Sequence, residues 1–130
     1  MTEAAIRHAT GLVTAGLTRA GQLPDALALL TVAVRADLPL DRGDMEGYGR
    51  DLIAPMLLDH PDEPLPEALG KVPALRRGML AALGEAVSTR ESAVLAVATK
   101  LDGTVSQEEL SAYPRLRRLL LVARAAREPQ

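Results

Sequence analysis

Leucine and alanine dominate this chain, and that bias constrains the fold more than any single motif does. The 130 residues include 23 Leu and 22 Ala, but only two Tyr and no Phe or Trp. Leu and Ala favour helices, whereas strands use β-branched and aromatic side chains. A chain of this length can bury a core without disulfides or metals. The composition therefore predicts an all-α fold: one helical domain over residues 1–130, built as a compact bundle of six to eight helices.

Caps, prolines and apolar spacing divide the chain into helices. Thr2 and Pro24 suit the first positions of the first two helices, and Pro55 predicts a kink in the third. Ser88 and Ser106 each precede a glutamate by three residues, which is the spacing of a capping box. Helices are therefore expected over 3–20, 24–36, 44–58, 66–70, 73–87 and 89–101 and from 107 to about 127 with a break at 114, and a flexible loop over 59–66.

Composition also indicates where in the cell the protein is expected and which kinds of partner it is expected to bind. Without cysteine the chain forms no disulfide framework, and no apolar run reaches the roughly 18 residues of a membrane-spanning helix. The N-terminus lacks the basic-then-apolar order of a signal peptide. A net charge of −2 argues against general binding to nucleic acid or to anionic membranes. We therefore expect a cytoplasmic protein whose partner is another protein or a second copy of the chain.

No constellation of catalytic residues is evident. His8 and His60 stand far apart and outside any zinc motif, and the glycine-rich stretch 42–51 lacks the ending of a phosphate-binding loop. No serine or threonine has a recognisable base beside it. The last helix is rich in arginine, which indicates a solvated face or, alternatively, a patch for an acidic partner or nucleic acid. We therefore predict that the protein is not an enzyme.

The segment 102–110, Asp-Gly-Thr-Val-Ser-Gln-Glu-Glu-Leu, is the most distinctive motif. Its first interpretation is structural: a turn at Asp-Gly followed by a well-capped helix start. Its second interpretation is a cation loop, because its oxygen-bearing residues match the later ligand positions of an EF-hand. Ala98 and Lys100 would occupy the first two ligand positions and supply no oxygen, so a normal EF-hand is not expected.

The same region resembles the tellurite-resistance TerB-like family. The matching stretch, Ala-Val-Leu-Ala-Val-Ala-Thr-Lys-Leu-Asp-Gly over 93–103, precedes an acidic helix start, and Ala-Leu-Leu-Thr-Val-Ala-Val-Arg-Ala-Asp over 28–37 is its earlier counterpart. The two stretches suggest two related halves, although Leu38 and Pro39 replace the expected glycine. The resemblance covers about 26–58 and 88–121. It implies a helical bundle whose two acidic turns face each other and hold Ca²⁺, Mg²⁺ or Mn²⁺. The implied ligands are Asp37, Asp41, Asp44, Glu46, Asp102, Glu108 and Glu109.

Two functions remain open on these grounds. The resemblance implies a non-enzymatic stress-response or interaction module with an acidic divalent-cation site. The alternative is a helical scaffold or partner-binding domain without metal, which could pair with itself through a Leu/Ala-rich helix face.

Overall fold

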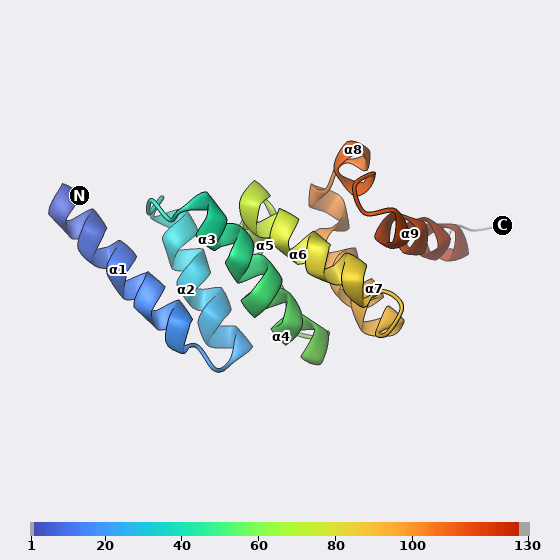
Figure 1. Cartoon of the computed structure of the whole chain (residues 1–130), viewed down its shortest axis with the longest axis horizontal. Helices are drawn as coiled ribbons and strands as arrows, with labels where there is room; N and C mark the ends of the chain where they lie inside the picture. The colour runs from blue at the N-terminus through green and yellow to red at the C-terminus, as the bar shows by residue number, and fades with distance from the viewer. Residues whose placement is uncertain (1, 128–130) are drawn as a thin grey trace.

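The fold is a row of helices that follow one another along the chain. The computed structural model describes residues 2–127, and over that range it contains no strand. Figure 1 shows the row running from α1 at one end to α9 at the other. The elements are α1 (Glu3–Arg19), α2 (Leu23–Arg35), α3 (Arg42–Gly47), the π-helical η1 (Tyr48–Ile53), α4 (Ala54–Asp59), α5 (Glu67–Gly70), α6 (Pro73–Ala86), α7 (Glu91–Leu101), the 3-10 turn η2 (Asp102–Thr104), α8 (Gln107–Leu110) and α9 (Pro114–Arg127).

This architecture confirms the predicted all-α bundle. Because α3, η1 and α4 follow one another without a break, residues 2–127 form eight helices if these three elements count as one. The core consists of aliphatic and methionine side chains, mainly leucines, and none of the residues described is both polar and buried. None of these helices is long and apolar enough to cross a membrane.

Side-chain caps form at the starts of α1, α3 and α8, and one predicted cap does not form. The Thr2 hydroxyl accepts a hydrogen bond from the Ala5 N–H at 3.1 Å, and the Ser106 hydroxyl accepts one from the Glu109 N–H at the same distance. The capping box predicted at Ser88 does not form, because α7 begins only at Glu91 with no side-chain cap. Residues 87–90 instead form the turn that ends α6, where the Arg90 N–H donates to the Ala86 carbonyl.

The closest helix crossing joins α3 and η1 to α6, and two glycines make it possible. A Cβ atom on Gly78 would lie 2.0 Å from the Glu46 carbonyl oxygen, and one on Gly49 would lie 2.2 Å from that of Leu75. Each glycine therefore lets the backbone of the opposite helix approach to contact distance. This crossing fixes α6 against the middle of the row.

The sequence predicted a kink at Pro55, and the structure has a π-helical segment just before this residue. Proline has no N–H to donate four residues back, and its ring crowds the carbonyl there. The preceding segment is π-helical, and the Ala54 N–H bonds the Gly49 carbonyl five residues back. A π-helical turn is a recognised way for a helix to absorb such a misfit without ending.

The predicted loop over 59–66 is confirmed over residues 60–66, since Asp59 still belongs to α4, and side chains from α7 and the residue before it hold the loop in place. The Lys100 ammonium donates to the carbonyls of Pro61 and Glu63, the latter at 2.5 Å. The Arg90 guanidinium donates to the Leu58 carbonyl at 2.7 Å just before the loop. The loop is therefore anchored on α7 at several points.

Candidate functional site

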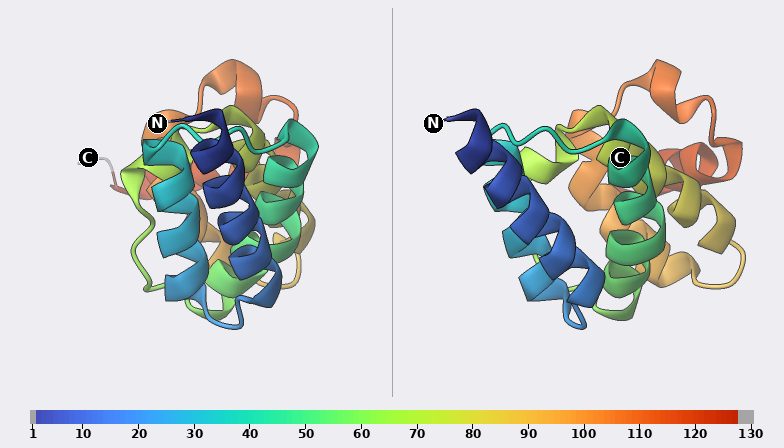
Figure 2. Two further views of the ribbon diagram at one scale, coloured as in Figure 1. Left: turned by 90° about the vertical axis from the view of Figure 1, so that its left-hand side faces the viewer. Right: turned by 60° about the vertical axis from the view of Figure 1, so that its left-hand side comes forward.

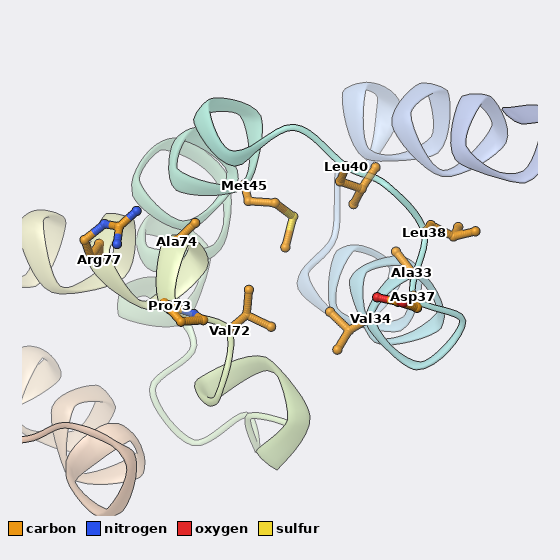
Figure 3. Close-up of a pocket in the computed structure, with 10 residues that line it drawn as sticks. All are labelled: Ala33, Val34, Asp37, Leu38, Leu40, Met45, Val72, Pro73, Ala74 and Arg77. Atoms are coloured by element: carbon orange, nitrogen blue, oxygen red, sulfur yellow. The ribbon is translucent and has the colours of Figure 1, made fainter. Parts of the chain in front are cut away.

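A groove lies between α2 and the pair α3/α6. It encloses about 260 Å³. Figure 3 shows Val34 of α2, Met45 of α3 and Val72, the residue before α6, pointing into the gap. Ten residues line the groove: Ala33, Val34, Asp37, Leu38, Leu40, Met45, Val72, Pro73, Ala74 and Arg77. Apolar side chains therefore form most of its wall.

Two opposite charges mark the two sides of this groove. Asp37 belongs to the α2 side and Arg77 to the α6 side (Figure 3), and both are exposed. Arg77 has one loose ion pair, with its Nε 4.0 Å from a carboxylate oxygen of Glu46. At such a distance and exposure the pair contributes little to stability, so the Arg77 guanidinium is available to a ligand.

Asp37 owes its position to the way α2 ends. Its φ of 53° is positive, a backbone conformation that favours glycine and that Asp tolerates better than most residues. The Leu38 N–H bonds the Ala33 carbonyl at 2.9 Å, and the Asp37 N–H bonds the Val34 carbonyl at 3.2 Å. This pair of bonds is a Schellman cap, with Asp37 standing where glycine is commonest. The cap turns the chain and leaves the carboxylate at the rim of the groove.

The first predicted acidic corner is not assembled as a metal site. Asp41 caps α3, where its Oδ1 accepts from the Gly43 N–H at 2.7 Å. Asp44 is exposed in the first turn of the same helix, and Glu46 lies near Arg77. Asp37 lines the groove at the start of the α2–α3 connection. These four carboxylates therefore have separate local roles.

The second predicted corner is paired with arginines. Asp102 forms a two-point ion pair with Arg124 of α9, and Glu109 accepts from the Arg76 Nε at 3.0 Å through both oxygens. The Arg76–Glu109 pair is mostly shielded, with 15% and 19% of the two side chains exposed. Glu108 is exposed in the first turn of α8. Two of the three carboxylates thus already have a cationic partner.

The two corners do not share a cation site among the residues that the structure describes. Between residues 2 and 127, no three acidic or histidine side chains come together in an arrangement able to hold a metal ion. Figures 1 and 2 show α5 and α6 between the α2–α3 connection and the α7–α8 corner. Binding of Ca²⁺, Mg²⁺ or Mn²⁺ stays a prediction without support from this geometry. The relation between the two halves likewise stays a prediction.

The two tyrosines whose pKa values are raised, Tyr48 and Tyr113, do not line the groove. Burial raises the pKa of Tyr48, and the nearby Asp44 carboxylate raises it further, while a hydrogen bond with Thr14 offsets part of the effect. Burial likewise raises the pKa of Tyr113, with Glu109 adding to it. A shift that keeps tyrosine neutral is a consequence of packing and creates no general base near neutral pH.

The sequence patterns did not reveal the groove. Its apolar wall comes from residues on α2, α3 and the start of α6, which are far apart in the chain. Helical spacing does not tell which apolar side chains, such as Val34 and Met45, line a surface groove. The only groove residues that the sequence marked were Asp37, where α2 ends, and Pro73, which opens α6.

Fold and groove together define a class: a small helical domain with an apolar, charge-flanked recess. The family model for the C-terminal domain of GTPase-associated protein 1, GAP1-C, matches residues 1–130. The chain therefore belongs to the GAP1-C family. The resemblance to TerB-like proteins was wrong, because the short Ala/Val-rich helix and Asp-Gly turn that carried it occur here in a different family. Comparisons with curated proteins and with solved structures give no match.

Proposed function

We propose that this GAP1-C domain is a non-catalytic binding module whose groove receives a segment of a protein partner in a GTPase-containing assembly. The observation that carries the proposal is the groove itself, an apolar recess with Asp37 on one side and Arg77 on the other. The description of the family as GTPase-associated supports the choice of assembly. The cytoplasmic location predicted from the sequence is compatible with such a role and stays a prediction.

Charge complementarity specifies the occupant. A short amphipathic segment could place apolar side chains against Val34, Met45 and Val72, as apolar helices do in hydrophobic grooves. A basic residue of the segment would then face Asp37, and an acidic one would face Arg77. Pairs at such a rim set orientation and specificity more than affinity.

Two substitutions on one helix test the groove. Val34→Glu places a charge in the recess, whereas Val32→Glu places the same charge on a side chain that is 57% exposed and outside it. The partner is first identified by crosslinking and then reconstituted from two purified proteins, so that binding is measured directly. Circular dichroism melts establish that both variants fold.

We expect Val34→Glu to weaken the reconstituted complex at least about tenfold and Val32→Glu to leave it nearly unchanged. A partner that contains or assembles with a GTPase domain supports the proposal. The proposal is wrong if no two-component complex forms, or if both variants bind as well as the parent chain. Sedimentation of the domain alone distinguishes the competing possibility, a homodimer, because a homodimer would be seen without any partner.

A further inference from the structure

Positive charge is concentrated on helix α9, although the chain as a whole has a net charge of −2. Its residues, Pro114–Arg127, include five arginines and no acidic residue. It lies at the end of the row opposite α1 (Figure 1). The groove between α2 and α6 is therefore a separate surface.

Three of these arginines are free to meet a partner. Arg124 is engaged by Asp102, but Arg115, Arg117 and Arg118 are exposed and form no ion pair with any residue that the structure describes. An exposed guanidinium presents several N–H groups in a planar fork that matches a carboxylate. The exposed surface of α9 therefore carries guanidinium N–H groups that form no ion pair within the described part of the chain.

Exposed apolar side chains lie beside these arginines. Val122 is 62% exposed and Leu121 is 44% exposed, which makes them two of the few large apolar residues so open to solvent. Leu116 and Leu120 point the other way, into the core. The helix therefore has a buried stripe and, next to it, a mixed apolar and basic one.

Two of the free arginines, Arg115 and Arg118, line a shallow hollow of about 340 Å³ together with Val122. Arg115, Arg118 and Val122 occupy positions i, i+3 and i+7, so they follow one line along α9. Their neighbours across the hollow are Val87 and Glu91, and Leu119 completes the lining. Glu91 is the one acidic residue of this lining, so two arginines outnumber it.

We propose that this α9 hollow binds an acidic amphipathic segment of a protein partner. Carboxylates of the segment would accept hydrogen bonds from Arg115 and Arg118, and an apolar side chain between them would cover Val122 and Leu119. Nucleic acid fits less well, because the apolar floor offers no partner to phosphates and Glu91 repels them. This inference does not depend on the occupant of the groove.

The test uses a labelled synthetic helical peptide in which Glu residues recur at i, i+3 and i+7 beside Leu. A matched peptide carries Gln in place of every Glu. Fluorescence anisotropy measures binding to the full chain and to Arg115→Glu/Arg118→Glu. The control variant Arg19→Glu/Arg35→Glu reverses two other exposed arginines, on α1 and α2, so it makes the same change in net charge.

We expect the Glu peptide to bind, to weaken as salt rises, and to lose at least about tenfold in affinity on the α9 double variant. The control variant should bind as the parent does. Val122→Glu, on a side chain that can be changed without disturbing the core, should also weaken binding. The proposal is overturned if the Glu and Gln peptides bind alike, if the two double variants behave alike, or if duplex DNA or phosphatidylserine vesicles bind the α9 surface and the Glu peptide does not.

Discussion

The crossing of α3/η1 with α6 offers the sharpest test of the fold, through Gly78→Ala. Glycine in the interior of a helix costs about 1 kcal/mol relative to alanine, so a gain would be expected if only the helix mattered. The structure instead predicts that Gly78→Ala lowers the stability of the fold. The new Cβ would lie 2.0 Å from the Glu46 carbonyl oxygen and 2.8 Å from the Arg50 nitrogen. These atoms are backbone and cannot rotate away.

The magnitude follows from how far the helices must separate. An ordinary carbon–oxygen contact needs more than 3 Å, so the crossing must open by about 1 Å, and overpacking of this kind costs about 1–3 kcal/mol or more. Buried side chains at the crossing, such as Ile53, Leu75 and Met79, would then lose part of their packing. We expect a net loss of about 2 kcal/mol, which lowers the melting midpoint of a domain of this size by roughly 6–10 °C.

The assay is urea unfolding followed by circular dichroism, with Gly47→Ala as the matched control. Gly47 lies two residues from Gly49 in the same continuous helix, has helical φ and ψ of −61° and −42°, and has nothing within 4 Å of a built Cβ. Its substitution should leave stability unchanged or raise it by up to about 1 kcal/mol. Gly49→Ala should be as harmful as Gly78→Ala, and the double variant should lose less than the sum, because the first Cβ already separates the helices. If Gly78→Ala matches Gly47→Ala, the helices do not approach through these glycines.

Four further predictions concern side chains and ions. Arg76→Met should cost about 2–3 kcal/mol in urea unfolding, because it leaves Glu109 and the Gly70 carbonyl without their shared donor; a loss under about 0.5 kcal/mol would contradict the pairing. Asp37→Gly should raise stability by about 0.5–1 kcal/mol, since glycine suits the positive φ; a lower midpoint would show that the carboxylate stabilises the cap. Because the pKa of Tyr48 is raised in the folded state, the unfolded chain ionises first and stability should fall as pH rises above about 10. Tyr48→Phe should lessen that fall in alkaline melts, and an identical pH profile would count against it. Finally, millimolar Ca²⁺, Mg²⁺ or Mn²⁺ should leave the melting midpoint unchanged, whereas a rise with concentration would support the cation prediction.

Much of the helical framework could be predicted from the sequence because its signals are local. Thr2, Pro24 and Ser106 act within one turn of their own helix, so their neighbours in sequence decide the outcome. Ser88 has the same spacing to a glutamate as Ser106 does, yet it lies in the turn that ends α6. Whether a hydroxyl caps the next helix or belongs to the end of the previous one depends on where that previous helix stops.

The contacts that decide the candidate sites could not be predicted because they join distant residues. Arg76 lies 33 residues from Glu109 and Arg124 lies 22 residues from Asp102. A carboxylate that follows Asp-Gly looks the same in sequence whether its counterion is a metal or an arginine. The choice depends on which helix packs against the corner, and only the three-dimensional arrangement decides that.

Helix α6 pairs with one carboxylate of each acidic corner. Its consecutive residues Arg76 and Arg77 face opposite ways: Arg76 reaches Glu109 beside the α7–α8 corner, while Arg77 lies near Glu46 beside the α2–α3 corner. The two pairs differ in exposure, since Arg76 is largely shielded whereas Arg77 is nearly half exposed. A shielded ion pair is costly to break, and a loose exposed one is not. Arg76 is therefore committed to the fold, and Arg77, next to the groove, is the α6 arginine that can exchange its partner for a ligand.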